Sequence, residues 1–552
     1  MFTRSLRPRT LTSALSTPRS LARQLHSQQP TPPLRASPSR APPKNPKHAA
    51  VEPVAFVLAF TLSVGAAYAL DRYTNTPASL DPPPAGASDP ENKTLALQAQ
   101  NYPNVMAPQM PPGRPGTLTP EQETKLKEMW AQTLEIFGVA PEGTSSNGAA
   151  TPTTTPGTPD PSGDGKKPKS KGMKLFGRKN KDEGAGADGD NNDKHGQTKE
   201  FQQALASQKP EELREAFWSL VKHDHPDALL LRFLRARKWD VSAALVMFVS
   251  TLHWRSKEMN VEQIMYTGEE RAFKDSKNGA GGDKKEGADF MAQLRMGKSF
   301  LHGLDKDGRP CCYVRVRLHK QGEQSEKSLE HFTVYTIETT RMMLKPPVDT
   351  ATIVFDMSEF SLANMDYTPV KFMIKCFEAN YPECLGSVLV YKSPWVFQGI
   401  WKVIRGWLDP VVANKVHFAS NVDDLQQFIP RSQISKELGG DEDYTYKYPE
   451  PVEGENKQME DTAAKEKILS EKTELVKSYE AETLSWVAGE DAGEGRMRLA
   501  QRLSENYWKL DPYVRARSMY DRSGVISEGG KLNFYPSSGG AKADAGGDGD
   551  LD

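Results

Sequence analysis

Apolar positions between residues 201 and 448 follow first helical and then strand-like spacing. Helical spacing covers 211–221, 228–237 and 241–259. Four strand-like runs follow, with helical segments between them: PCCYVRVRL, ATIVFDM, GSVLVY and KVHFAS. Alternation of strands and helices at this spacing predicts an α/β fold with a mostly parallel sheet flanked by helices.

The segment SPWVFQGIWKVIRGWLDP, residues 393–410, carries three tryptophans in a helical apolar pattern. One stripe contains Phe397, Ile400, Trp401, Ile404, Trp407 and Leu408, and further apolar residues widen it, namely Trp395, Val396 and Val403. A helix with so broad an apolar surface needs two apolar partners. It is either a doubly buried core helix or a helix between a pocket and a membrane. Lys402 and Arg405 favour the second interpretation, because a doubly buried helix need not carry two cations.

The first fifty residues contain Arg and Ser but no Asp or Glu, which is typical of a mitochondrial transit peptide; a basic tail is the alternative. Residues 54–70 are seventeen positions without a charge, at the short end of the roughly 17–25 that span a bilayer. We expect a membrane anchor there. Basic residues precede it and acidic residues follow it, so the bulk of the chain is expected to face the intermembrane space.

Residues 73–199 are rich in Pro, Gly, Thr and Ser and are expected to form a disordered linker. Within it, 119–138 has the signals of a helix, with Thr119 as N-cap and Gly138 as stop. Eight basic residues lie in 166–181. This cluster is either a solvated linker or a site attracted to anionic lipid, at roughly 1 kcal/mol per basic residue.

The C-terminal part is expected to contain surface helices and a tail. The interval 452–538 holds two helical patterns, 463–488 and 496–510, and 539–552 is acidic and expected to be disordered. The chain has 552 residues with 41 prolines and 42 glycines, so we expect one main globular domain joined to much unfolded connection. A net charge of −1 gives no overall bias toward nucleic acid.

Motifs of common enzyme classes and of metal sites are missing from the chain. It has no GxxxxGK[ST], no GxGxxG after a strand, no HExxH and no GxSxG. DKDGRP begins like a calcium loop, but Pro310 and Val316 stand where Gly and Glu are required, so it predicts a turn between strands. His223, Asp224 and His225 are too close together to wrap a metal. The function expected is binding, with no metal and no catalytic residue.

The four cysteines are scattered through apolar runs without metal-ligand spacing: Cys311, Cys312, Cys376 and Cys384. They predict buried thiols rather than a metal site or disulfides.

Four segments carry a resemblance, in this order: LLLRFLRARKWDVSAAL, DKDGRP, YPECLG and WLDPVVANKV. Together they resemble the CRAL-TRIO lipid-binding family, in particular its fungal branch of phosphatidylinositol transfer proteins. The resemblance implies an N-terminal helical subdomain at 201–270 and a lipid-binding domain at 289–448. It also implies a lipid pocket with the sheet as floor and the helix at 395–408 as gate. The inner face of that helix would line the pocket, and its outer face, led by Trp395, Phe397 and Trp401, would enter a membrane.

The resemblance also implies a headgroup site. Glu383 matches a residue that accepts hydrogen bonds from inositol hydroxyls, and Lys415 matches one that neutralises the phosphate. Arg237 and Lys238 match the basic pair that completes the site, although two cations at a helix C-terminus can simply be stabilising. A buried Glu and Lys are costly unless they are paired or satisfied by a ligand.

Two departures from the family pattern concern specificity. Cys384 stands where the family has an arginine, so one cationic contact is missing. Ala351 and Ile353 stand where dual-specificity members supply two hydroxyls for phosphatidylcholine. A pocket with these residues is more apolar, which suits a sterol-like or squalene-like second ligand.

We therefore expect a phosphatidylinositol transfer protein that exchanges a second apolar lipid at phospholipid membranes, without a cofactor. The alternative is a non-transferring sensor or scaffold that signals through its C-terminal helices. A chain that retains residues 1–70 is expected to be anchored in a mitochondrial membrane. A product beginning at Met106 would lack both targeting signals and is expected in the cytoplasm, or peripherally on the endoplasmic reticulum or lipid droplets.

Overall fold

The computed structural model describes residues 110–139, 193–490 and 493–536, all of which belong to one compact unit, Ser88–Asp552. The predicted transit peptide, membrane anchor, basic cluster and acidic tail lie outside the described residues. Among the helices that are described, none is long and apolar enough to cross a bilayer.

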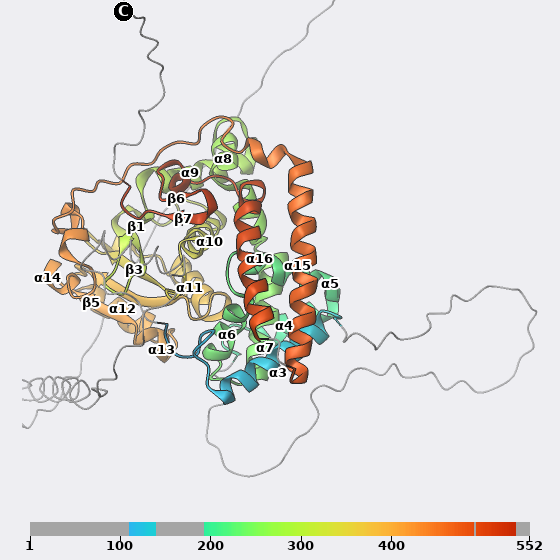
Figure 1. The fold of residues 1–552 in the computed structure, drawn as a ribbon. Coiled ribbons are helices and arrows are strands. Elements are labelled where there is room, and N and C mark those ends of the chain that lie inside the picture. The colour runs from blue at the N-terminus through green and yellow to red at the C-terminus, as the bar shows by residue number, and fades with distance from the viewer. Residues whose placement is uncertain (1–109, 140–192, 491–492, 537–552) are drawn as a thin grey trace, which may run out of the picture. The chain divides into compact units, whose positions relative to one another are not determined.

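A helical lobe combines elements from three distant parts of the chain (Figure 1). It contains α3 (Pro120–Ile136), α4 (Gln197–Ser207), α5 (Pro210–Val221), α6 (Pro226–Ala236), α7 (Val241–His253), α15 (Thr462–Ala488) and α16 (Gly493–Val514). Trp130, Phe217 and Tyr479 are buried in one core. The predicted surface helices 463–488 and 496–510 are confirmed as α15 and α16, and most of their side chains are not buried. Each helix also buries one set of side chains, including Tyr479 and Leu503, in this core.

The start of α3 follows from its sequence. The Thr119 hydroxyl accepts a hydrogen bond from the backbone N–H of Gln122, and the Gln122 side chain accepts one from the backbone N–H of Thr119. This reciprocal capping box satisfies two N–H groups that a helix leaves unpaired at its start. Pro120 occupies the first turn, where its missing N–H costs nothing.

The sheet has five strands in the order β1 (Ser299–Leu304), β2 (Pro310–Arg315), β3 (Ala351–Asp356), β4 (Leu385–Tyr391) and β5 (Val416–Ala419). β1 is antiparallel to β2, and the remaining pairs are parallel. The four predicted strands are confirmed as β2 to β5. DKDGRP is the turn between β1 and β2, and the Asp305 carboxylate accepts hydrogen bonds from the backbone N–H groups of Asp307 and Arg309.

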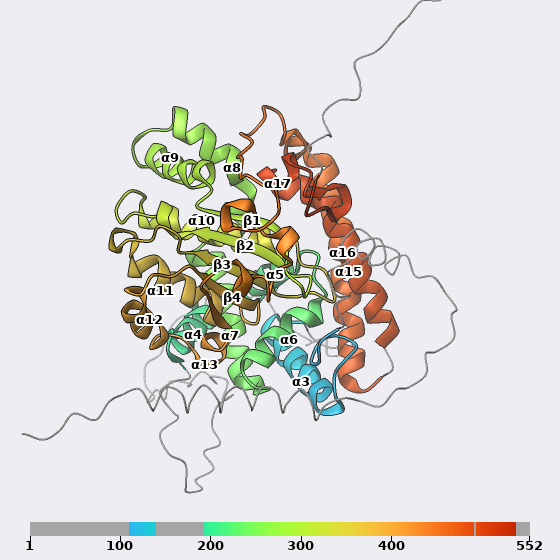
Figure 2. The ribbon, with the colours of Figure 1, turned by 90° about the vertical axis from the view of Figure 1, so that its left-hand side faces the viewer.

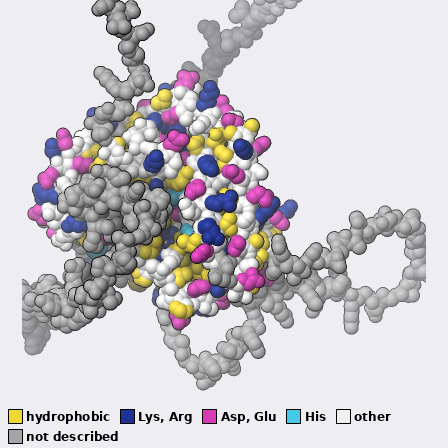
Figure 3. All heavy atoms as spheres, in the orientation of Figure 1, with side chains coloured by type: hydrophobic (Ala, Val, Ile, Leu, Met, Phe, Trp, Pro, Cys, Tyr) yellow, Lys and Arg dark blue, Asp and Glu magenta, His cyan; other side chains and the backbone are white. Residues whose placement is uncertain are grey.

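The other helices lie around the sheet. They are α8 (Val261–Asn278), α9 (Gly281–Met296), α10 (Glu326–Met342), α11 (Tyr367–Lys375), α12 (Phe397–Arg405), α13 (Pro410–Ala413), α14 (Val422–Leu425) and α17 (Met519–Arg522). Figure 2 shows α10, α11 and α12 following one another along the sheet. On the described part of the surface that Figure 3 shows, acidic and basic side chains are interspersed.

The C-terminal residues protect the edge of the sheet. The backbone N–H groups of Leu301 and Leu304 in β1 donate to the hydroxyls of Tyr520 and Tyr535. A short hairpin of β6 (Ile526–Ser527) and β7 (Lys531–Leu532) lies between these tyrosines in the chain. Side chains thus occupy edge N–H groups that could otherwise pair with another strand.

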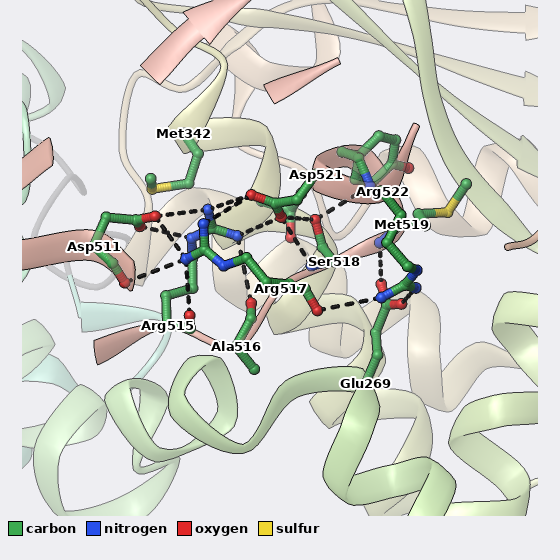
Figure 4. Close-up of polar contacts among 12 residues, drawn as sticks. Glu269, Met342, Asp511, Arg515, Ala516, Arg517, Ser518, Met519, Asp521 and Arg522 are labelled. Atoms are coloured by element: carbon green, nitrogen blue, oxygen red, sulfur yellow. Dashed lines mark hydrogen bonds and ion pairs between the residues drawn. The ribbon is translucent and has the colours of Figure 1, made fainter. Parts of the chain in front are cut away.

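Buried ion pairs connect the C-terminal part to α8, and we call this group the clasp: Asp511, Arg515, Arg517, Asp521, Arg522 and Glu269 (Figure 4). Arg515, whose side chain is 4% exposed, pairs with Asp511 at 2.7 Å and with Asp521 at 2.8 Å. Although burial raises the pKa of Asp521, the Arg515 and Arg517 guanidinium groups lower it below its usual value. The clasp makes the C-terminal part integral to the fold.

All four cysteines are free thiols, and Cys311, Cys312 and Cys376 are buried while Cys384 is half-buried. Burial raises the pKa of Cys312 to about 11. The prediction of unpaired, largely buried thiols is confirmed.

Candidate functional site

An apolar cavity of about 270 Å³ lies between the sheet and helices α10, α11 and α12. Its floor is one face of the sheet, where Cys312, Ile353, Val388 and Val416 stand side by side in adjacent strands. Side chains alternate between the faces of a strand, so the next row on the same face lies two residues further on. That row also lines the cavity and contains Val314, Phe355 and Val390.

Helix α12 closes the cavity on one side. Phe397, Ile400 and Ile404 are buried, and Phe397 and Ile404 line the cavity. Their spacing of three and four residues places them on one face of the helix. Phe397 packs edge-on against Phe360, with ring centroids 5.8 Å apart. We call α12 the gate helix, because it separates the cavity from the outside.

Phe397 was predicted to lie on the outer face of the gate helix, but the structure places it on the inner face. This side chain is 7% exposed and faces the cavity, so its expected place on the outer face is wrong. Trp395 precedes the helix and is 86% exposed. Lys402, Val403 and Arg405 are also exposed. This exposed surface also excludes the interpretation of a doubly buried helix.

Trp401 lies on the gate helix and Trp407 lies two residues after its end, and both are half-buried. Trp401 lines the cavity and packs against Phe418, with ring centroids 5.4 Å apart. Trp407 packs against Tyr367, and the Lys371 ammonium lies 4.9 Å from its ring centroid. Neither tryptophan therefore belongs wholly to the outer face.

Glu383 and Lys415 are brought together by the parallel sheet. Glu383 lies two residues before β4 and Lys415 immediately before β5, and neighbouring parallel strands begin at the same edge. The Glu383 Oε2 and Lys415 Nζ atoms are 3.9 Å apart, and each side chain is 23% exposed. Glu383 has a φ of 56°, an uncommon backbone conformation outside glycine. The pair is accessible to a ligand at this edge.

The two specificity positions and Cys384 lie at or near the same edge. Ala351 begins β3, and its backbone N–H donates to the carbonyl oxygen of Cys384 at 2.9 Å. Ile353 lies further along β3 and lines the cavity. The structure thus connects the edge of the sheet to the apolar cavity through β3.

Arg237 and Lys238 lie at the C-terminal end of α6, apart from this pair. The Arg237 guanidinium donates to Gln197 Oε1 at 2.5 Å. Burial lowers the pKa of Arg237, and the carboxylates of Asp409 and Glu378 partly offset this. Lys238 is exposed. In the described part of the chain, no hydrogen bond or ion pair joins either residue to Glu383 or Lys415.

Arg232 is a contact that the sequence analysis missed. Its guanidinium donates to the Glu383 carbonyl oxygen at 2.6 Å and to the Asp349 carbonyl oxygen at 2.7 Å. It also lies 3.5 Å from the Cys384 sulfur. The position that lacks the family's arginine therefore still has a cation beside it. An arginine inside the apolar run LLLRFL was the available signal.

Two more arginines extend this cationic cluster. Arg114 pairs with Asp349 at 3.0 Å, and Arg235 pairs with the same carboxylate at 3.3 Å. Burial, together with the nearby charges of Arg114 and Arg232, lowers the pKa of Arg235 to about 10. Arg114 comes from the segment before α3, so the N-terminal extension contributes directly to this region.

Glu378 holds the segment that follows the gate helix and leads into α13. Its carboxylate accepts hydrogen bonds from the backbone N–H of Asp409 at 2.6 Å, from Lys194 at 2.6 Å and from His195 at 2.9 Å. Lys194 also donates to the carbonyl oxygen of Trp407. Burial raises the pKa of Glu378, but the hydrogen bonds from His195 and Lys194 outweigh it and lower the pKa. We call this arrangement the hinge contact.

The closely spaced His223, Asp224 and His225 have separate structural roles. His223 hydrogen-bonds to the Leu344 carbonyl oxygen, Asp224 pairs with Arg341, and His225 accepts from the backbone N–H of Asp227. Within the described ranges, no group of three His, Cys, Asp or Glu side chains could hold a metal ion.

Two family models match this chain. The CRAL/TRIO domain model matches residues 294–440, and the CRAL/TRIO N-terminal domain model matches 197–250. A CRAL-TRIO domain-containing protein of Schizosaccharomyces pombe is 44% identical over 425 residues, which cover 75% of this chain and 92% of that protein.

Two further relatives are named as particular proteins and not only by their domain. The phosphatidylinositol transfer protein CSR1 of Eremothecium gossypii is 39% identical over 449 residues, covering 75% of this chain and 98% of that protein. The SEC14 cytosolic factor of Yarrowia lipolytica is 30% identical over 231 residues, covering 39% of this chain and 43% of that protein.

Proposed function

Because this chain belongs to the CRAL-TRIO family, we propose that it binds phosphatidylinositol and exchanges it, together with a second apolar lipid, between membranes. One observation carries the proposal: an apolar cavity is bounded by the gate helix, whose outer face exposes Lys402 and Arg405 and which directly follows the exposed Trp395. A relative named as a phosphatidylinositol transfer protein, matched over nearly its whole length, supports it. Exchange of this kind involves no covalent step.

The free energy of burying the acyl chains of a phospholipid explains why a gate is needed. Two acyl chains of about 18 carbons, at about 0.8 kcal/mol per methylene, represent nearly 30 kcal/mol of gross burial. The lipid must therefore pass directly from bilayer to cavity. A cavity of about 270 Å³ is smaller than the roughly 300–1,000 Å³ of sites that enclose drug-sized ligands. The gate helix must move outward before a phospholipid can enter.

The headgroup is proposed to bind at the edge of the sheet beside the cavity. Glu383 would accept hydrogen bonds from inositol hydroxyls, and Lys415 would pair with the phosphate, with Arg232 close by. Arg237 and Lys238 stay candidates for an outer contact. Ala351 and Ile353 offer no hydroxyl to a choline headgroup. This set of side chains favours phosphatidylinositol over phosphatidylcholine.

Transfer between vesicles tests the proposal. The full chain should move phosphatidylinositol but not phosphatidylcholine from donor to acceptor vesicles. Lys415→Ala should abolish phosphatidylinositol transfer, and Glu383→Gln should weaken it, while the melting temperature changes little. Lys436→Ala is a matched control, because this lysine forms an exposed ion pair with Asp443. Equal transfer of both lipids by the unaltered chain would contradict the proposal.

The proposed subcellular localisation depends on residues 1–109, which lie outside the described range. We propose that a chain retaining residues 1–70 is held in a mitochondrial membrane and faces the intermembrane space. A chain beginning at Met106 would keep α3 and every element of the lipid-binding part. Both versions with a C-terminal fluorescent tag distinguish the outcomes. Full-length protein throughout the cytosol would refute the anchor, and a Met106 product that binds no lipid would refute the shorter form.

A further inference from the structure

Arg114 belongs to the described part of the N-terminal extension, residues 110–139, yet it reaches the edge of the sheet where the headgroup is proposed to bind. It lies outside both ranges that the family models match, 197–250 and 294–440. Its guanidinium donates to both carboxylate oxygens of Asp349, from Nε at 3.0 Å and from Nη2 at 3.2 Å. A two-point contact of this kind fixes the orientation of the carboxylate as well as compensating its charge.

The turn that presents Arg114 is held by its own hydrogen bonds and by α6. The Thr117 hydroxyl donates to the Pro111 carbonyl oxygen at 2.8 Å and accepts from the backbone N–H of Arg114 at 3.1 Å. Arg235 on α6 donates to the Gly113 carbonyl oxygen at 2.8 Å. Gly113 has a φ of 72°, and a Cβ there would lie 3.3 Å from Arg235 Cδ. The turn therefore packs closely against α6 and places the Arg114 side chain.

Asp349 connects this turn to the headgroup site. Its carboxylate also accepts from Arg235 at 3.3 Å, and its backbone carbonyl oxygen accepts from Arg232 at 2.7 Å. The same Arg232 guanidinium donates to the Glu383 carbonyl oxygen at 2.6 Å. Although burial raises the pKa of Asp349, the charge of Arg232 and the hydrogen bond from Arg114 lower it below its usual value. The carboxylate is therefore ionised at neutral pH.

Glu383 depends on such support from its surroundings. Its φ of 56° is a conformation that costs free energy in a residue other than glycine and persists where neighbouring groups hold it. Arg232 supplies one of these contacts at the Glu383 carbonyl oxygen. The Glu383 carboxylate, 3.9 Å from Lys415, projects from this same backbone. The backbone of Glu383 therefore determines where its carboxylate meets an inositol hydroxyl.

Arg114 affects this site through the charge of Asp349. With Arg114 present, the Asp349 carboxylate is held by guanidinium groups on the side of the N-terminal turn. Without Arg114, the carboxylate has lost its two-point partner and is able to pair with the nearby Arg232 instead. That pairing would draw Arg232 away from Glu383. It would also leave a less compensated negative charge at an edge that is proposed to receive a phosphate. Both effects weaken binding of an anionic headgroup.

We propose that Arg114 is a positioning residue for the phosphatidylinositol headgroup and acts through the Asp349 carboxylate. It keeps that carboxylate from Arg232, which supports Glu383. The inference rests on the proposed function, since it concerns the headgroup site of the same ligand. The alternative is that Arg114 only fastens the N-terminal extension to the fold. However, α3 already buries Trp130 in the core of the helical lobe, so the extension is anchored by apolar contacts as well.

Transfer of phosphatidylinositol by the full chain, measured at increasing mole fractions of that lipid in donor vesicles, tests the proposal. Arg114→Gln should raise the mole fraction for half-maximal transfer about tenfold, equivalent to ~1.4 kcal/mol, with the maximal rate and the melting temperature little changed. Arg114→Lys keeps the charge but not the two-point contact, so its value should be intermediate. An unchanged half-maximal mole fraction in Arg114→Gln, or an effect confined to the maximal rate, would overturn the inference.

Arg295→Gln is the matched control. Arg295 makes the same two-point contact with Glu450, at 2.6 and 2.9 Å, and both side chains are exposed. This variant should transfer phosphatidylinositol with the half-maximal mole fraction of the unaltered chain. Both arginine variants should also bind phosphatidylcholine vesicles normally, because neither arginine lies on the gate helix. Loss of vesicle binding by Arg114→Gln would contradict a role confined to the headgroup.

A double-mutant cycle distinguishes positioning through Asp349 from direct contact with the lipid. Asp349→Asn removes the charge through which Arg114 is proposed to act. Adding Arg114→Gln to that variant should therefore change the half-maximal mole fraction by less than about twofold. Asp349→Ser serves in the same cycle if Asp349→Asn does not fold. An Arg114→Gln effect that persists at full size in either background would contradict the proposed route.

The unaltered chain separates this inference from the proposed function. If it transfers phosphatidylinositol while Arg114→Gln and Arg295→Gln behave alike, the result would contradict the inference alone. If the unaltered chain transfers no phosphatidylinositol, the result would contradict the proposed function and, with it, this inference.

Discussion

The gate helix and the clasp are held in the fold by opposite kinds of contact. The gate helix buries Phe397 and Ile404 against a cavity, and its outer face carries exposed charges. The clasp buries whole ion pairs, such as Arg515 with Asp511 at 2.7 Å. Apolar contacts with a cavity can be exchanged for contacts with lipid at little cost. Opening a buried ion pair leaves uncompensated charges and costs several kcal/mol.

This difference indicates which part of the molecule moves. The gate helix can swing outward when a bilayer replaces the cavity as its apolar surroundings. The clasp has no comparable substitute, and it fixes the segment between Asp511 and Arg522 to α8 through Glu269. Signalling by displacement of the C-terminal helices would have to break these pairs. Lipid exchange through the gate is the function that the contacts favour.

The largest expected effect is the loss of a clasp charge. Asp511→Ala leaves Arg515 buried with one carboxylate fewer and should lower the free energy of unfolding by about 3–5 kcal/mol. Urea denaturation measures it. Glu494→Ala, which breaks an exposed pair with Arg498, should change the free energy by less than about 0.5 kcal/mol. Similar effects of the two variants would remove the distinction between the clasp and the surface.

The next effect concerns the exposed tryptophan beside the gate. Trp395→Ala should weaken binding to vesicles by about 1.5–3 kcal/mol, roughly ten- to a hundredfold, and leave the melting temperature unchanged. Met497→Ala, another exposed apolar side chain on α16, should not affect vesicle binding. Sedimentation with vesicles measures both. Equal losses in both variants would mean that the gate is not the docking face.

The hinge contact offers a third comparison. Glu378→Gln removes the negative charge that holds Lys194, His195 and the backbone of Asp409. The gate helix should open more easily, so phosphatidylinositol transfer should become severalfold faster, while stability falls by about 1–3 kcal/mol. Glu474→Gln, at an exposed pair with Lys477, is the control. Slower transfer with normal vesicle binding would show that the hinge contact does not restrain the gate.

The smallest effect concerns the two cations on the gate. Replacing Lys402 or Arg405 by Gln should weaken binding to anionic vesicles by about 1 kcal/mol each. The loss should diminish as salt rises, because exposed charges are screened beyond about 10 Å at 0.1 M. Binding to neutral vesicles should not change. An equal loss on neutral vesicles would assign these residues a packing role.

The sequence predicted those parts of the fold that depend on local pattern. Four strands, the DKDGRP turn and the Thr119 cap follow from alternation, turn chemistry and capping. The first strand was missed because His302 and Gly303 interrupt the apolar pattern of SFLHGL. The direction of Phe397 depends on where the gate helix begins, and helix boundaries are read poorly from sequence.

The site was predictable only in part, because some of its contacts depend on the tertiary fold and not on local sequence pattern. Glu383 and Lys415 meet because two strands begin at one edge of the sheet, which follows from parallel topology. Arg232 reaches Cys384 from a helix about 150 residues away in the chain, and only the tertiary fold specifies that contact. Lys298 likewise contacts His319 and Gln324 from another part of the chain, so no local pattern indicated these contacts.

The lipid held by the protein tests the central claim most directly. Full chain freed of lipid is incubated with vesicles of phosphatidylinositol and phosphatidylcholine in equal amounts, re-isolated, and weighed intact by native mass spectrometry. The account predicts a single bound phosphatidylinositol per chain, lost in Lys415→Ala and kept in Lys436→Ala. A chain that emerges empty, or that carries phosphatidylcholine as readily as phosphatidylinositol, would contradict it.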